Sequence, residues 1–447
     1  MRTFRFLDGC LLLLILSVLS SCNKDIPIPE TEQPTTSTEA KQLTSVVAQQ
    51  SAQRTRNEAV AIAREFLQGE EGLKGEIMTN SVGVVQFDID YLVRPESNAT
   101  GYSQNFVINW PVDTIFYILN RKDTKGFFII SGDKRIPELI AFSDESSFDR
   151  KNIDEKSGMS LFLDMLPVYY EQKLGTPKLE IFGDIAGDTQ AKWKGGGSEI
   201  IFNRWQTTER TENLVHVTWG QSEPYNNNAP RVNGKRAPAG CVATATAQFL
   251  SAFDYPTTLA DRKLNWHLLK KIVYKEYKGA EKREFAEQVA FLFRKIGDAL
   301  GNDWGENGTK ASTSDVPDVL REMGYRHTPN LLNYNLPLIL ESIKEKSPAI
   351  MSGRRKAEKG TVGHAWLCDG YWKQERIVLE LLGEAKKVNR EIEERVLLHC
   401  NWGWNGTDNG YFLESVFDTA RPVVSDGDAD VCANYEYNIR NITGART

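Results

Sequence analysis

Residues beyond position 200 carry two hydrophobic patterns in succession, and this order restricts the fold more than any other feature of the chain. In the front part, Phe285, Val289 and Ile296 recur on one helical face, which predicts an amphipathic helix. The rear part contains strand-like runs at 364–372, 377–382, 396–401 and 410–413. Helices followed by a sheet within one domain predict an α+β fold with a cleft between its two halves.

A smaller α+β body is predicted ahead of this domain. Residues 85–91 alternate apolar and polar side chains, which is typical of a half-buried strand. Similar short runs follow at 106–110, 115–119, 127–131 and 139–142. A helical stretch at 159–172 contains Pro167, where we expect a kink or a break. Together these elements predict a small domain with an antiparallel sheet over residues 55–190.

The boundary between the two bodies is marked by glycine. Gly195, Gly196 and Gly197 are consecutive, which favours an open linker that proteases can reach. We therefore expect a linker and processing region at 191–204 and a second domain at 205–447.

The amino terminus has the pattern of an export signal. Arg2 and Arg5 precede an apolar run at 10–19, which is too short to cross a bilayer. Small residues then lead to Cys22, as in a bacterial lipobox, so we expect a signal peptide at 1–21 and acylation of Cys22. A plain signal peptide cut near the same place is the alternative.

Lipidation would tether the chain to a membrane. Residues 22–54 are rich in Pro, Thr, Ser, Glu and Gln, which predicts a flexible tether. We expect an exported bacterial lipoprotein that faces the periplasm or the cell surface, from which a processed form could be released.

Composition excludes several classes of protein. Lys plus Arg number 54 and Asp plus Glu number 60, giving a net charge of −6, which argues against a nucleic-acid surface. Six cysteines in 447 residues are too few for a disulfide scaffold. No Cys-x-x-Cys or His-x-x-x-His spacing suggests a metal, and the acidic run 426–430 lacks the later ligands of a calcium loop. We expect neither a cofactor nor a metal.

Cys241 is the first candidate for chemistry. It follows Gly240 and begins an alanine-rich helical stretch. A cysteine in the first helical turn meets unpaired backbone N–H groups and the positive end of the helix dipole, so we expect a lowered pKa and a nucleophilic thiolate. A small buried hydrophobe is the commoner role for a cysteine.

Three further residues could complete a site with Cys241. His364 follows Gly363 at the start of a strand and could steady the thiolate and protonate a leaving amine. The Asn401 amide could orient the imidazole, with Trp402 covering that bond from water. The amide of Gln221 and the backbone N–H of Cys241 could receive an oxyanion.

Each of these residues also has a plainer interpretation. A lone histidine is more often at the surface or in a satisfied core. The Asn401–Gly406 segment also suits a β-turn with aromatic packing, and Gln221 lies in an ordinary loop sequence. The order Gln, Cys, His, Asn strengthens the catalytic reading, because papain-type enzymes place His and Asn at comparable distances after the cysteine.

These motifs resemble the streptopain family of bacterial cysteine endopeptidases. The matching pieces are Gln221 with Pro224-Tyr225-Asn226, the segment 240–248, Gly363-His364-Ala365 and Asn401-Trp402-Gly403-Trp404. Residues 58–67 and 126–133 are similar to the inhibitory propeptide of that family.

The resemblance implies a papain-like, two-lobed peptidase that is made as a zymogen. Cys241 would be the nucleophile, His364 the acid/base and Asn401 its orienting partner beside Trp402. Gln221 would complete the oxyanion hole and Gly363 would contact substrate. Residues 55–190 would occlude the cleft as an intramolecular inhibitor until a cut near the glycines, or around Arg204 or Arg210. The partners would be protein or peptide substrates and the lipid membrane, with no nucleic acid.

Some features depart from that family or stay open. The interval from His364 to Asn401 is longer than expected, and 374–395 has the character of an inserted hairpin. Cys368 and Cys400 could form a disulfide, although buried thiols are preferred. A transglutaminase-like acyltransferase with the same site, and a non-catalytic lipoprotein that binds through Trp402, Trp404 and Tyr411, are alternative functions.

Overall fold

The computed structural model describes residues 52–73, 85–93, 114–174, 191–195, 198–271, 278–327, 330–357, 360–382, 387–419 and 437–447. All of these lie in one unit, Gln49–Thr447. Cys22, the predicted signal peptide, most of the tether, the run at 106–110 and the acidic run at 426–430 lie outside them. Among the described helices, none has the length and apolar character needed to span a bilayer.

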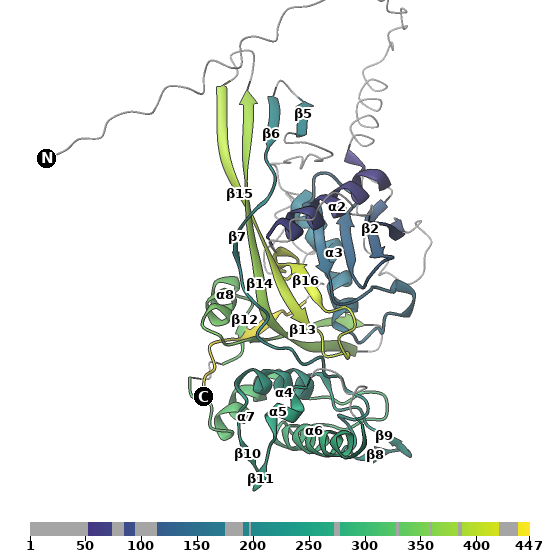
Figure 1. The fold of residues 1–447 in the computed structure, drawn as a ribbon, viewed down its shortest axis with the longest axis vertical. Helices are drawn as coiled ribbons and strands as arrows, with labels where there is room; N and C mark the ends of the chain where they lie inside the picture. The colour runs from purple at the N-terminus through teal and green to yellow at the C-terminus, as the bar shows by residue number, and fades with distance from the viewer. Residues whose placement is uncertain are drawn as a thin grey trace, which may run out of the picture. The chain divides into compact units, whose positions relative to one another are not determined.

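Helices form one lobe of the second domain (Figure 1). They are α4 (Cys241–Phe253), α5 (Trp266–Leu269), α6 (Gly279–Ala299) and α7 (Val316–Glu322). The predicted apolar face of α6 is confirmed, because Phe285, Val289 and Ile296 are fully buried in a core shared with α4. Two short hairpins flank the helices: β8 (Arg231–Val232) with β9 (Lys235–Arg236), and β10 (Thr258–Leu259) with β11 (Arg262–Lys263).

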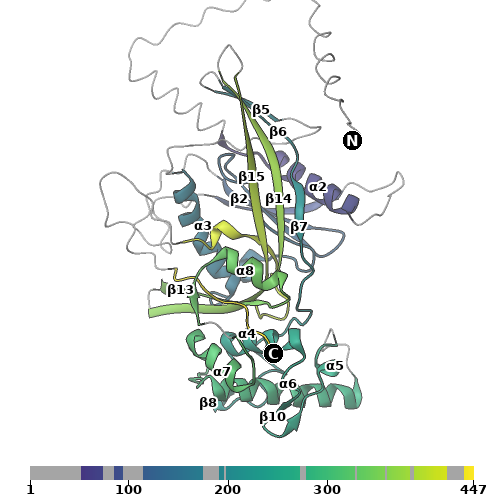
Figure 2. The same cartoon turned by 90° about the vertical axis from the view of Figure 1, so that its left-hand side faces the viewer.

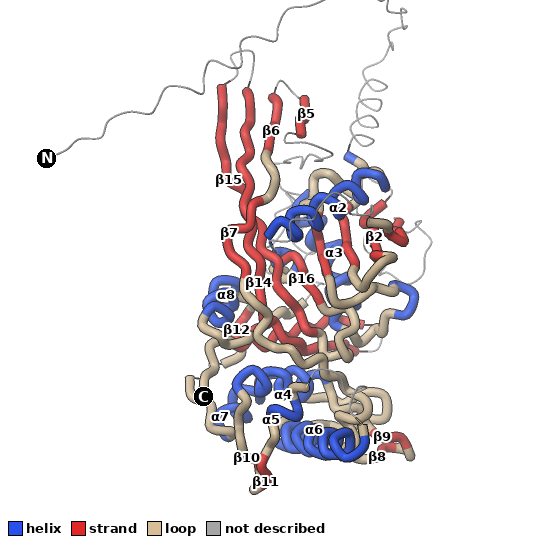
Figure 3. The backbone as a smooth tube through the Cα atoms, viewed as in Figure 1, coloured by secondary structure: helices blue, strands red, loops and turns tan. Residues whose placement is uncertain are grey.

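An antiparallel sheet forms the second lobe, and Figure 3 shows helices and strands separated in this way. Its strands are β12 (Leu332–Asn333), β13 (Ala349–Ala357), β14 (Gly360–Leu382), β15 (Lys387–Asn401), β16 (Gly410–Leu413) and β17 (Arg440–Ile442), with α8 (Leu336–Lys344) packed against β13 and β14. The order is β16-β15-β14-β13-β17-β12. Helices followed by a sheet were predicted, and the α+β class is confirmed.

The preceding domain extends the same sheet. It contains α2 (Arg56–Leu73), β1 (Phe87–Val93), β2 (Thr114–Arg121), β3 (Phe127–Ser131), β4 (Leu139–Ser143) and α3 (Gly158–Leu174). β1 to β4 form an antiparallel meander, as predicted, and β4 then pairs with β16. Of the kink or break expected at Pro167, the break is wrong. α3 continues through it, because its buried side chains on both sides of the proline, including Phe162 and Tyr170, fix the helix in the core.

The predicted insertion at 374–395 is a hairpin. β14 and β15 pair from Leu367–Asn401 out to Leu382–Lys387. This register keeps the bases of the two strands side by side, so the insertion does not separate residue 364 from residue 401.

The predicted open linker has regular structure where it is described. β5 (Ala191–Gly195) pairs with β6 (Ser198–Phe202), and β6 pairs with residues 378–382 of β14. β7 (Gln206–Arg210) pairs with residues 372–375 of the same strand. Figure 2 shows β5, β6 and β7 alongside the β14–β15 hairpin. The inserted hairpin thus supplies the ladder partners that the sequence of the linker did not reveal.

Candidate active site

Cys241 is the first residue of α4, as predicted from the sequence. Gly240 precedes it with φ 91°, a left-handed conformation that favours glycine, and accepts hydrogen bonds at its carbonyl from both Thr244 N and Thr244 Oγ1. The approach to the helix is fixed by Thr309, whose Oγ1 donates to the Pro238 carbonyl at 2.6 Å. The backbone around the cysteine is therefore rigidly held.

The Cys241 sulfur is not a stabilised thiolate in this structure. Burial raises the pKa of the thiol, and the backbone groups of Ala365, Val242 and Cys241 only partly oppose this effect. The prediction of a lowered pKa is therefore wrong for this state, because loss of hydration outweighs the helix amides. This sulfur therefore lies beside the backbone of Ala365, the residue that directly follows His364.

His364 lies near the start of β14 and is 4% exposed. Its Nε2 lies 2.9 Å from the Trp402 carbonyl, which can only accept, so Nε2 carries the proton. The ring is stacked with Trp366 at a centroid distance of 6.3 Å. Burial lowers the His364 pKa to about 4, while the Trp402 carbonyl and Asp154 act weakly in the other direction. The imidazole is thus neutral at pH 7, and no thiolate–imidazolium pair exists in this state.

Asn401 does not hold His364 in this structure. Its Oδ1 accepts from Gln248 Nε2 at 2.9 Å and from Gly403 N at 3.3 Å, and its Nδ2 donates to the Val217 carbonyl at 2.8 Å. Both ends of the amide are therefore used to fix the loop after β15. The sequence predicted an Asn401–His364 bond. The Trp402 carbonyl holds the imidazole instead.

Trp402 is buried and held by the loop that follows it. Its Nε1 donates to the Asp408 carbonyl at 3.0 Å, and its N–H donates to Asn409 Oδ1 at 3.0 Å. Gly158, at the start of α3, lies directly on the indole. A Cβ there would be 2.0 Å from Cε3 of Trp402. The ring that was predicted to shield a histidine–asparagine bond is itself covered by the preceding domain.

Gln221 and Gly363 are placed close to these groups. The Gln221 carbonyl accepts from Ala239 N at 2.8 Å, which joins its loop to the segment leading into Cys241. Gly363 is exposed on β14 opposite Arg354, one residue before His364. Both positions border Cys241 or His364, so all six predicted site residues with described coordinates belong to one region.

A segment of the preceding domain, residues 144–158, contacts both lobes around this region. Asp408 N, in the sheet lobe, donates to Ser146 Oγ at 2.8 Å. Lys156 Nζ donates at 2.7 Å to the Asn307 carbonyl, in the helical lobe. Arg355 donates to the Glu155 carbonyl at 3.3 Å and forms an ion pair with Asp164 at 2.9 Å. These contacts connect the segment to both lobes, and Asp154 within it is close enough to His364 for its charge to act on the imidazole.

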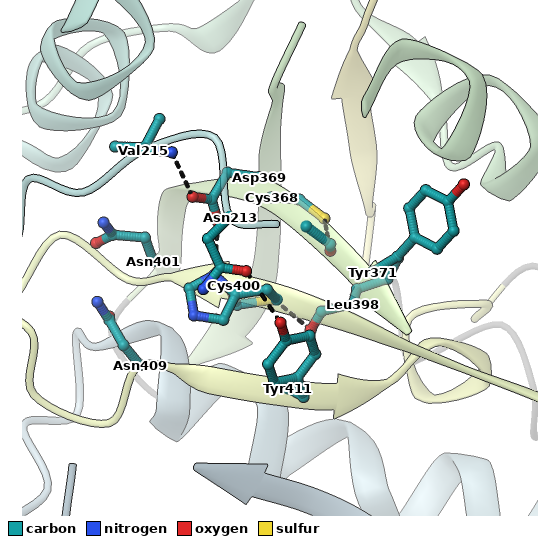
Figure 4. A network of polar contacts seen from close by, with 12 residues as sticks. Asn213, Val215, Cys368, Asp369, Tyr371, Leu398, Cys400, Asn401, Asn409 and Tyr411 are labelled. Atoms are coloured by element: carbon teal, nitrogen blue, oxygen red, sulfur yellow. Dashed lines mark hydrogen bonds and ion pairs between the residues drawn. The ribbon is translucent and has the colours of Figure 1, made fainter. Parts of the chain in front are cut away.

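Sequence reasoning missed a buried ionic network beside the site. His399 Nδ1 lies 2.6 Å from Asp369 Oδ1, and its Nε2 lies 3.3 Å from Glu145 of the 144–158 segment. Asp369 also accepts from Val215 N at 2.9 Å, and Tyr411 donates to Asn213 at 3.0 Å, as Figure 4 shows. The two carboxylates outweigh the burial of the imidazole and raise the His399 pKa to about 10. Only the β14–β15 register, which places Gly370 opposite His399, reveals this pairing.

Gln248 was also missed. It is fully buried on α4, seven residues after Cys241, and its Nε2 donates to both Asn401 Oδ1 and the Trp219 carbonyl. It therefore ties α4 to both flanking loops. The sequence signal that could have revealed it is a glutamine among the apolar residues of an alanine-rich helical stretch.

The remaining cysteine and metal expectations concern the sheet lobe. Cys368 and Cys400 lie opposite each other on β14 and β15 and are free, buried thiols, as preferred from the sequence. Within the described ranges, no three His, Cys, Asp or Glu side chains gather as metal ligands.

Comparisons with known proteins agree with this architecture. Residues 219–412 match the Peptidase C10 family, and residues 33–167 match the Spi protease inhibitor family. Streptopain of Streptococcus pyogenes is 24% identical over 332 residues, which span 65% of this chain and 71% of streptopain. The thiol protease/hemagglutinin PrtT of Porphyromonas gingivalis is 22% identical over 351 residues, spanning 72% of this chain and 36% of PrtT.

A solved structure shares the fold. A fragment of Prevotella intermedia prointerpain A superposes with a TM-score of 0.52 at 20% identity, covering 81% of this chain and 99% of the fragment. The inhibitor match precedes the peptidase match along the sequence. The chain therefore belongs to the streptopain family of cysteine peptidases and is a zymogen whose own amino-terminal domain, the propeptide, inhibits it.

Proposed function

We propose that Cys241 is the nucleophile and His364 the general acid/base of this endopeptidase. The observation that carries the proposal is the contact between Cys241, at the start of α4, and the Ala365 backbone, directly after His364. Because Nε2 of His364 donates to the Trp402 carbonyl, Nδ1 is the unprotonated ring nitrogen that can take the Cys241 proton.

In the released enzyme, His364 takes the proton of the Cys241 thiol. The thiolate attacks the scissile carbonyl carbon and forms a C–S bond. The carbonyl oxygen becomes an oxyanion that the Cys241 N–H and the Gln221 amide stabilise. His364 then donates its proton to the leaving amine, and water hydrolyses the thioester with the same residue as base. Gly363, which carries no side chain, leaves room for the substrate backbone.

Asn401 and Trp402 have a positioning role in this proposal. The Asn401 amide fixes the loop that carries the Trp402 carbonyl, and this carbonyl determines which His364 nitrogen bears the proton. Because Asn401 Oδ1 is bound by Gln248 in the zymogen, a direct bond to His364 requires exchange of that partner after activation.

Latency has two physical causes in this account. The segment 144–158 is hydrogen-bonded to both lobes, and burial of Cys241 and His364 keeps both reacting groups neutral. A neutral thiol is a poor nucleophile, and a histidine with a pKa of about 4 is a weak base. Release of the propeptide rehydrates the site and moves both pKa values toward catalysis.

We also propose that Cys22 is acylated and holds the protein on a bacterial membrane facing the periplasm or the cell surface. The support is the short apolar run and the small residues before Cys22. Intact mass of the mature amino terminus tests this. Loss of the acyl mass and release from membranes in Cys22→Ala are expected, whereas an unmodified wild-type Cys22 contradicts it.

The catalytic proposal is tested with full-length wild type, Cys241→Ala and the buried-thiol control Cys368→Ala. Casein digestion and self-processing should vanish in Cys241→Ala and persist in the control. Equal processing by wild type and Cys241→Ala contradicts the assignment. Adding a primary amine separates hydrolysis from acyl transfer, because incorporation of the amine that outruns hydrolysis would favour a transferase.

A further inference from the structure

A buried ionic cluster lies away from Cys241, where the propeptide, the β6–β7 connection and the β14–β15 hairpin meet. Glu138 of the propeptide accepts from Arg395 Nη1 at 2.9 Å and from Trp205 Nε1 at 2.5 Å. Arg376 Nη1 lies 3.9 Å from the same carboxylate. The guanidinium carbons of Arg376 and Arg395 lie over the Trp205 ring, 4.5 and 4.3 Å from its centre. We call Trp205, Arg376 and Arg395 the arginine pocket.

The arginine pocket is built to hold an anion. Arg376 and Arg395 are 2% and 7% exposed, and Glu138 is 8% exposed. Burial alone would raise the Glu138 pKa, yet the two arginines lower it to about 2. The carboxylate is therefore fully ionised at neutral pH and is held by charge-assisted hydrogen bonds.

The pocket is continuous with a strand-pairing surface. Leu139 directly follows Glu138 and begins β4, which pairs with β16 through Phe142–Tyr411 and Ala141–Phe412. The propeptide thus presents one carboxylate to the arginines and then an apolar strand to the β16 edge. Main-chain pairing gives affinity, and an anchored side chain gives specificity.

Loss of the propeptide changes the charge of this region. Glu138 leaves with it, as does Glu65, which pairs with Arg204 at 2.7 Å. With a cut near the glycines, Arg204, Arg376 and Arg395 remain, and Glu393 stays bound to Arg376 Nε at 2.6 Å. The region therefore loses two carboxylates and keeps its three guanidinium groups, which makes it more positively charged beside the open β16 edge.

We propose that the released peptidase uses the arginine pocket and the β16 edge as an exosite for protein substrates, binding an extended segment in which a glutamate precedes apolar residues. This rests on the proposed function, because the exosite opens only when the propeptide leaves. The carboxylate takes the place of Glu138, and the apolar residues pair with β16 as β4 does. Occupation of the exosite tethers a substrate chain whose cleavable bond lies at Cys241.

Binding is measured on a Cys241→Ala chain with a site-specific protease sequence inserted between Gly195 and Gly196. The folded chain is cut there and the propeptide is removed by gel filtration in high salt. The probe is a fluorescein-labelled peptide of residues 136–143, with a matched Glu138→Gln peptide as control. A third peptide carries a glutamate followed by four apolar residues in an unrelated order.

The expected result is that both glutamate peptides bind about tenfold more tightly than the glutamine peptide, because the charge pair is lost in the latter. The preference should disappear in the Arg376→Gln/Arg395→Gln double variant and weaken with added salt. Equal affinity of the glutamate and glutamine peptides, or a preference that survives in the double variant, overturns the exosite. Binding of the propeptide sequence alone overturns it as well, because the pocket would then serve only the inhibitor.

A kinetic arm separates this proposal from the catalytic one. In the processed wild type, a protein substrate with a Glu-Leu-Ile-Ala-Phe tag should show a KM about tenfold below that of its Gln-tagged twin, with kcat unchanged. A short fluorogenic peptide should be cut equally by wild type and by Arg395→Gln. Absence of any Cys241-dependent cleavage refutes the proposed function, while the peptide-binding result on Cys241→Ala still decides the exosite.

Discussion

Gly158 is the propeptide residue that packs on the Trp402 indole, and Gly158→Ala should weaken this contact. The new Cβ would lie 2.0, 2.6 and 2.8 Å from three carbons of the indole. The indole has little room to move, because it is buried and bound to the Asp408 carbonyl. Overpacking of this kind costs about 1–3 kcal/mol. The fraction of molecules in which the start of α3 is detached from Trp402 should therefore be roughly 5- to 150-fold larger than in wild type.

The assay is the rate at which an active-site epoxide labels Cys241 in the unprocessed chain, together with the rate of self-processing. Both should rise about tenfold or more in Gly158→Ala. Gly308→Ala is the matched control, because the nearest atom to its new Cβ is Lys156 Nζ at 4.0 Å. The processed enzyme should be unaffected, since residue 158 leaves with the propeptide. Labelling and processing of Gly158→Ala at the wild-type rate would refute the claim that this contact maintains latency.

Three further predictions concern buried polar groups. Burial and the Asp149 carboxylate raise the Asp408 pKa to about 7. A carboxyl group with a raised pKa destabilises the folded zymogen as pH rises from about 4 to about 7. Asp408→Asn should therefore raise the Tm of the zymogen at about pH 8 and leave it unchanged near pH 3.5. The His399 pKa is raised to about 10, so the stability that its ion pair contributes is complete below about pH 6.5 and is lost as pH rises through about 10. His399→Gln should therefore lower the Tm most at about pH 6. A loss of Tm that does not depend on pH contradicts the ion pair. Gln248→Leu should lower the unfolding free energy by about 1–3 kcal/mol in urea, because the Trp219 carbonyl loses this donor and Asn401 Oδ1 keeps only Gly403 N. An unchanged midpoint would show that these bonds contribute nothing.

The parts of the site that follow from local sequence were predictable. Cys241 begins a helix because a glycine and a run of helix-forming alanines adjoin it, and His364 lies in a strand because the flanking residues are apolar and β-forming. The meander of the propeptide likewise follows from short apolar runs separated by turn residues. These features depend on neighbours within a few positions.

The electrostatic state of the site was not predictable in the same way. The pKa of Cys241 and of His364 depends on burial, and that burial involves residues far away in the sequence. The amide of Asn401 found partners 153 and 184 positions away, in Gln248 and Val217. The linker forms strands because the backbone of the inserted hairpin pairs with it. No local pattern carries information on such partners.

The pH dependence of Cys241 alkylation, compared between the full chain and the processed protein, tests the account most directly. We expect slow alkylation of the full chain that accelerates only above the ordinary pH range of a thiol, because burial raises the pKa of Cys241. The processed protein should react rapidly already at about pH 6, as a thiolate paired with His364 does, and His364→Ala should abolish this shift. Identical profiles for the full chain and the processed protein would contradict the claim that propeptide release creates the reactive pair.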